Sequence, residues 1–119
     1  MAAPNIVNVS NILGKTSVQS VGTSATAIVT NTAASGKVFK VNNIIVSNID
    51  GVDAADITVD LFRSSVAYRI ASTIAVPADA TLVVLSKETA IYLEEGDSIR
   101  LTGSATGDLQ AVCSYEEIS

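Results

Sequence analysis

The chain has 119 residues, a formal net charge of −5 and no histidine. Apolar residues make up 48% of it, which excludes a disordered chain, and no apolar run approaches the roughly 18 residues that a membrane-spanning helix needs. The negative charge disfavours binding to nucleic-acid phosphates, and the lack of histidine removes the usual general base and the commonest metal ligand.

Apolar and polar residues alternate along the chain, which is the period-two pattern of β-strands. The opening stretch 6–12 is extended and uncharged. Gly14-Lys15 is expected to break it before a short second strand over residues 18–21. A further strand is expected at 25–30, followed by a turn-rich loop at 31–36.

The strongest strand pattern spans Val38–Asn48. Phe39, Val41 and Ile45 are expected to face the core from this strand. The alternation is interrupted at Asn42-Asn43, which indicates either a β-bulge or a strand that passes from one sheet to another.

Turn residues separate the remaining strands. Pro77-Ala78-Asp79 is suited to a turn, and Glu94-Glu95-Gly96-Asp97 predicts a hairpin turn with a positive φ at Gly96. The strands between these turns are expected at 57–62, from 68 onward, at 81–85, at 90–93, around 99–101 and at 109–116.

Eight or nine short strands at this spacing predict one all-β domain. The expected fold is an antiparallel two-sheet β-sandwich of about eight strands, and a jelly roll is one topology open to it. Residues 13–119 form the predicted sandwich domain, and residues 1–12 are either an extended arm or its first strand. The predicted core consists of Phe39, Val41, Ile45, Val59, Leu61, Leu82, Val84, Leu93, Ile99, Leu101, Leu109 and Cys113.

Three carboxylates in one loop are the best metal candidate. Asp50, Asp53 and Asp56 could supply oxygen ligands to calcium. Their spacing is not that of an EF-hand loop, so a solvated polar loop is the stronger interpretation. No metal or other cofactor is therefore expected.

No set of residues predicts catalysis. Glu94, Glu95 and Asp97 could in principle divide acid and base roles, but a solvated turn explains them better. Serine is plentiful, yet the histidine that usually activates it is missing. The single cysteine, Cys113, continues an apolar alternation and is expected to be a buried small hydrophobe. The chain is therefore expected not to be an enzyme.

The N-terminal segment has an unusual balance of residues. Residues 2–12 are extended and carry no charge, whereas edge strands normally carry charges that discourage pairing. We expect Ile6, Val7, Val9 and Ile12 to act as apolar anchors on a partner, by β-augmentation for example. The alternative is an ordinary first strand. Met1–Asn5 has neither a basic nor an apolar signal region, so we expect no signal peptide.

The second half of the chain resembles small structural proteins of tailed-bacteriophage virions. The opening of the chain resembles versions of such proteins from large contractile-tailed phages of marine bacteria. The segments that carry the resemblance are IAVPADATLVVL (74–85), IYLEEGDSIRL (91–101) and VCSYEEI (112–118), with APNIVNV (3–9) and GKT (14–16) for the opening.

The resemblance implies a β-sandwich that assembles in many copies without catalysis. It implies a place in the virion after synthesis in the host cytoplasm, most directly as a capsid decoration (cement) protein. Its partners would be the major capsid protein or other virion proteins and further copies of itself, with neither nucleic acid nor membrane bound. A neck or tail accessory protein stays open. A receptor- or carbohydrate-binding tail-fibre module also stays open, although three Tyr, two Phe and no Trp leave few rings for sugar stacking.

Overall fold

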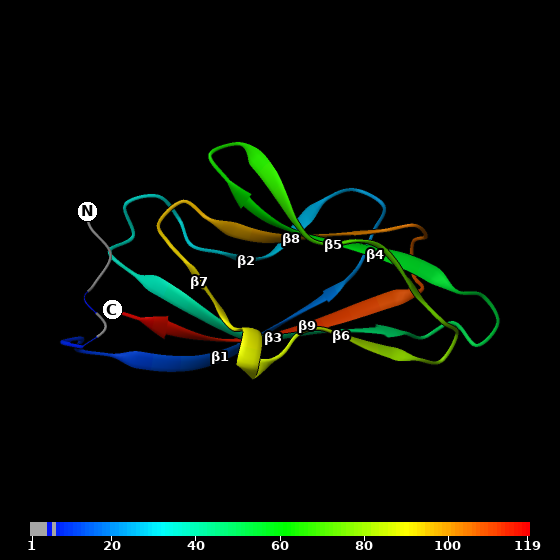
Figure 1. Cartoon of the computed structure of the whole chain (residues 1–119), viewed down its shortest axis with the longest axis horizontal. Helices are drawn as coiled ribbons and strands as arrows, with labels where there is room; N and C mark the ends of the chain where they lie inside the picture. The colour runs from blue at the N-terminus through cyan, green and yellow to red at the C-terminus, as the bar shows by residue number, and fades with distance from the viewer. Residues whose placement is uncertain (1–4, 6) are drawn as a thin grey trace.

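The computed structural model describes residue 5 and residues 7–119. Two antiparallel sheets pack face to face (Figure 1). Sheet A runs in the order β1-β9-β3-β6, and β7 pairs with β3 as well. Its strands are β1 (Ile12–Ser20), β9 (Leu109–Ile118), β3 (Val38–Asn48), β6 (Thr81–Leu85) and β7 (Ile91–Leu93). Sheet B runs in the order β2-β8-β4-β5, with strands β2 (Thr26–Thr30), β8 (Ser98–Gly103), β4 (Ala55–Arg63) and β5 (Val66–Val76).

The strand pairs nest along the chain. The first strand pairs with the last, β2 pairs with β8, β3 pairs with β6 and β7, and β4 pairs with β5. This is the order of a long hairpin rolled into two sheets, which defines a jelly roll. The predicted antiparallel two-sheet sandwich is therefore confirmed, and the jelly roll is the topology that it adopts.

The core lies between the two sheets and is built from small and medium apolar residues. Val41 of sheet A and Leu101 of sheet B are fully buried, as are Ile57 and Val59 on β4 and Cys113 on β9. Burial of a side chain of this size stabilises the fold by about 1.5–3 kcal/mol. Of the predicted core residues, Leu61, Leu82 and Val84 are only partly buried but pack against the core.

The alternation of β3 is shifted by a β-bulge at Asn42. Val41 lies opposite Tyr115, whereas Asn43 lies opposite Ser114, so Asn42 is one extra residue on β3. The bulge moves the core face from Val41 to Ile44 instead of Asn43. The predicted bulge is confirmed, but the prediction that Ile45 faces the core is wrong because the register changes before it.

The first strand begins later than expected and is longer. The opening stretch 6–12 was expected to be extended, but of its described residues only Ile12 lies in a strand. A break was predicted at Gly14-Lys15, but β1 runs unbroken from Ile12 to Ser20 and pairs with β9 throughout. A glycine need not end a strand whose backbone is held by a long neighbour. Residues 12–20 therefore form one edge strand of sheet A.

One of the predicted turns forms a hairpin, and another connects the two sheets. Ser64-Ser65 joins β4 to β5 as a two-residue hairpin loop, and both residues have a positive φ as a type I′ turn requires. Residues 94–97 were predicted to form a hairpin as well. That prediction is wrong, because β7 pairs with β3 in sheet A and β8 pairs with β4 in sheet B, so the turn crosses between the sheets. Gly96 has the expected positive φ.

Helical structure is minor in the part of the chain that the structure describes. The short 3-10 helix η1 (Lys87–Thr89) connects β6 to β7. Among residues 5 and 7–119, no helix has the length and apolarity needed to cross a bilayer.

Candidate interaction surface

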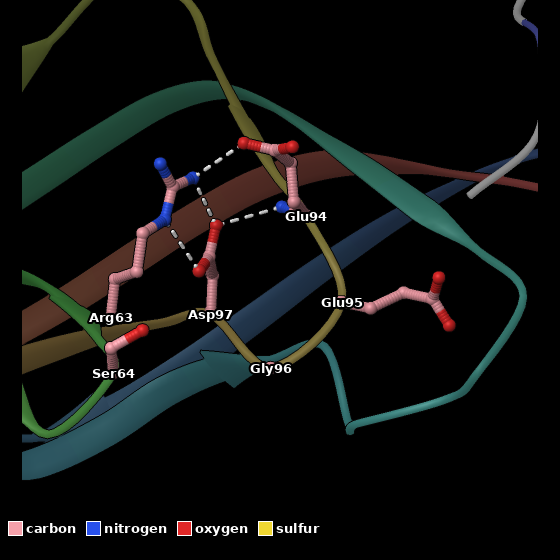
Figure 2. A pocket seen from close by; sticks show the side chains of 6 residues that line it. All are labelled: Arg63, Ser64, Glu94, Glu95, Gly96 and Asp97. Carbon is pink, nitrogen blue, oxygen red and sulfur yellow. Dashed lines mark hydrogen bonds and ion pairs between the residues drawn. The ribbon is translucent and has the colours of Figure 1, made fainter. Parts of the chain in front are cut away.

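A network of charged side chains lies where the chain crosses between the sheets (Figure 2). The guanidinium of Arg63, at the end of β4, donates from Nε to Asp97 Oδ1 at 2.8 Å and from Nη2 to Glu94 Oε2 at 2.8 Å. Asp97 Oδ2 accepts a further bond from the backbone N–H of Glu94 at 2.8 Å. These residues line an open hollow of about 400 Å³ together with Ser64, Glu95 and Gly96.

Asp97 is buried rather than solvated. Burial alone would raise its carboxyl pKa, but the hydrogen bonds from Arg63 and from the Glu94 N–H outweigh burial, so the pKa lies below its usual range. The hydrogen bond with the Asp97 carboxylate is the main cause that raises the pKa of Arg63. A carboxylate held ionised by a guanidinium is a poor proton donor. The interpretation of Asp97 as a residue of a solvated turn is therefore wrong, and the network stabilises the crossing.

Two buried asparagines reinforce the ends of the sandwich. Asn31 donates from Nδ2 to the carbonyl oxygens of Lys37 and Leu93. At another crossing, Asn48 donates to the carbonyl oxygens of Asp53 and Val76. Both asparagines appear in the sequence as ordinary loop or strand-end residues, and nothing local in the sequence shows that their amides become buried.

A second charged cluster fixes the start of β1. Glu117, on β9, is largely buried and accepts from Lys15 Nζ on β1 at 2.7 Å and from Lys37 Nζ ahead of β3. The hydrogen bonds from Lys15 and then Lys37 lower the pKa of Glu117. Glu117 therefore holds Lys15, the one charged residue of β1.

The candidate calcium ligands Asp50, Asp53 and Asp56 are not brought together. Asp50 Oδ1 accepts bonds from the backbone N–H groups of Val52 and Asp53, which is an Asx-type turn, while Asp56 lies on β4. Over residues 5 and 7–119, no three such side chains gather in a way that could hold a metal ion.

Cys113 lies in the middle of β9 and is fully buried. Burial raises the pKa of its thiol to about 12, so the thiolate that reactivity requires is not formed near neutral pH. The prediction of a buried small hydrophobe is confirmed.

The predicted N-terminal anchors differ in how exposed their side chains are. Ile6 lies outside the described residues. Val7 is 89% exposed and Ile12, the first residue of β1, is 56% exposed, whereas Val9 is half-buried. The backbone N–H groups of Ser10 and Asn11 both donate to the carbonyl oxygen of Ser119, so the segment is tied to the C-terminus just before β1.

The outer face of sheet A carries an apolar row that the sequence alone does not show. Val18, Val112, Ile45 and Val83 lie side by side on β1, β9, β3 and β6. Val18 is 72% and Val83 is 57% exposed. We call these four residues the valine row. The members of the row are scattered over the sequence, and the register between the strands is what brings them side by side.

The surroundings of the valine row are polar but uncharged. One adjacent row consists of Ser20, Gln110, Ser47 and Thr81, with Ser47 Oγ and Thr81 Oγ1 3.2 Å apart. A hollow of about 270 Å³ lies between β1 and β9 beside the row, lined by Val18, Gln19, Ser20, Gln110, Ala111 and Val112. An apolar centre with a polar rim is the usual composition of a protein–protein contact.

Comparison with known proteins gives information about the fold alone. No family model and no curated protein matches the chain. One solved structure that is similar comes from the Bacillus endospore appendages, described as a family of disulfide-linked pili. It is 11% identical, the match covers 100% of this chain and 96% of that one, and the TM-score is 0.54. The likeness shows that both chains share a two-sheet β-sandwich.

Proposed function

We propose that this protein is a non-enzymatic structural protein of a tailed-phage virion, and that it decorates the capsid by binding the major capsid lattice. The observation that carries this proposal is the valine row on the outer face of sheet A, flanked by rows of uncharged polar residues. The resemblance of residues 74–85, 91–101 and 112–118 to virion proteins supports the same conclusion.

The chemistry of this face suits a broad contact with another protein. Contiguous exposed aliphatic side chains gain free energy when a partner removes them from water, and the flanking hydroxyl and amide groups can bond across the rim. Because the face carries no charge in these rows, an acidic chain meets its partner there without like-charge repulsion. The N-terminal segment extends the contact beyond the sheet, with Val7 as an exposed anchor.

The likeness to the endospore pilus protein concerns the fold and does not extend to the linkage of that protein. That protein belongs to appendages described as disulfide-linked. In this chain the single cysteine is Cys113, which is buried inside the sandwich. Contacts between subunits would therefore be non-covalent, and many weak contacts on a lattice would hold the protein through avidity.

Cosedimentation with undecorated capsids tests the proposal. Purified protein should bind with a fixed number of copies per capsid, visible by cryo-electron microscopy. Val83→Asp with Val112→Asp should weaken binding by about tenfold or more, because two charges would be buried in the contact. The matched control is Val66→Asp, which changes an exposed valine of sheet B. It should bind like the wild type.

Two results would contradict this assignment. Binding of the double variant at wild-type affinity would remove the outer face of sheet A from the contact. A wild-type protein that ignores capsids and binds necks, tails or host glycans would favour one of the other virion roles.

A further inference from the structure

The four sheet edges of this molecule are protected to different degrees. An exposed edge strand is a template for pairing with another chain, and proteins blunt such edges with short strands, bulges and charges. In sheet B, β5 is interrupted by two register shifts against β4, and β2 has five residues with a shift of its own. The β3 side of sheet A is bordered by β6 and β7, with five and three residues.

The fourth edge, β1, is neither short nor bulged. It has nine residues and pairs with β9 without a register shift. Its one charged residue, Lys15, is held by Glu117 on the neighbouring strand. Most of its side chains are exposed, and its outward-facing residues, including Thr16 and Val18, carry no charge.

Gly14 gives this edge a specific shape. Glycine inside a strand often marks a bulge or the close approach of another backbone, and β1 has no bulge. A Cβ built at Gly14 would meet nothing within 4 Å, so there is open space beside it. Four residues farther along, Val18 projects into solvent with 72% of its surface exposed.

We propose that β1 pairs antiparallel with β1 of a second copy, about a twofold axis at Thr16. Thr16 is the central residue of the strand, so this register pairs all nine residues. It places Val18 of each copy opposite Gly14 of the other, where there is room for it. It also places Lys15 opposite Ser17, so no two like charges lie directly across from each other.

The result is a closed, self-complementary contact. A twofold axis makes the same edge serve both copies and leaves no β1 edge free for further growth. The two A sheets join into one sheet through β1, and the valine rows of the two copies come to lie on one continuous outer face. This inference goes beyond the proposed function, because it concerns the edge of sheet A and needs no capsid.

The test uses purified full-length protein. Sedimentation equilibrium should show a concentration-dependent dimer. Thr16→Lys and Thr16→Glu should each raise the dissociation constant by about three- to tenfold, because like charges would then face each other at the axis. An equimolar mixture of the two variants should recover dimers, since lysine would lie opposite glutamate. Ser72→Lys on the β5 edge is the matched control and should dimerise like the wild type.

Amide hydrogen exchange gives a second readout that does not depend on any variant. In the wild type, exchange within β1 should slow as the protein concentration rises, while exchange in β5 should not change. Dimers that persist unchanged in both Thr16 variants would overturn the proposal. A mixture that fails to recover dimers, or a wild type that is monomeric up to millimolar concentration, would do the same.

Discussion

At the residue scale, the surroundings of a carboxylate decide its role more than its position in a turn. Asp97 and Glu94 both lie in the crossing between β7 and β8, yet Asp97 is buried against Arg63 and Glu94 remains exposed. Carboxylates in a glycine-containing turn suggest side chains that are exposed to solvent. Only the fold brings Arg63, at the end of β4, close to them. The sequence therefore indicated the turn but not the ion pair inside it.

Replacement of Asp97 tests the stabilising effect of this ion pair. The pKa of Asp97 is lowered by folding, so its contribution is present above the unfolded pKa of about 3.9 and is lost as the pH falls through the folded value. Asp97→Asn should be less stable than the wild type by about 1–3 kcal/mol at pH 7, and the difference should shrink at pH 2–3.

Urea unfolding at several pH values measures this difference in free energy. Glu88→Gln, an exposed change in η1, is the control and should leave the wild-type curve unchanged. A gap between Asp97→Asn and the wild type that stays constant down to acidic pH would contradict the prediction.

At the scale of elements, strand positions were predictable and strand faces were not always so. The predicted bounds of β3 and β6, at 38–48 and 81–85, match the structure because alternation and turn residues are local signals. The face of β3 beyond Asn42 depends on how many residues oppose β9 across the bulge. The position of the bulge depends on how two strands pair, so it cannot be determined from the sequence of β3 alone.

Two neighbours on β3 provide the corresponding test. Ile44→Ala should lower the free energy of unfolding by about 2–5 kcal/mol, because Ile44 is fully buried and its loss leaves a cavity. Ile45→Ala removes the same atoms from the outward face and should cost much less, about 1 kcal/mol or below. Denaturant melts of both variants measure these losses. Equal losses would show that the bulge does not set the face.

At the scale of the whole molecule, the sandwich was predictable and the pairing of its strands was not. Spacing and composition predicted two antiparallel sheets, but only long-range register shows that β7 and β8 belong to different sheets. The valine row was missed for the same reason, since its four members come from four strands. The role of the N-terminal residues as anchors stays a prediction.

The nested topology predicts slow folding. The pairing of β1 with β9 brings together residues about a hundred positions apart, as Ile12 and Ile118 show. Loop-closure entropy opposes such contacts before they are stabilised. We expect refolding in milliseconds to seconds, as for other all-β sandwiches. Stopped-flow fluorescence of the tyrosines measures this rate, and refolding in microseconds would contradict the prediction.

The placement of the two chain ends also determines how the molecule would respond to mechanical force. Ser119 is hydrogen-bonded to Asn11, so the start of β1 and the C-terminus lie at the same end of the sandwich (Figure 1). Tension applied between the ends would therefore break the β1–β9 hydrogen bonds one pair after another, and would not load all of them at once in shear. A molecule loaded in this direction yields at low force. A force transmitted through contacts on the outer face of sheet A would instead be distributed over several strands at once.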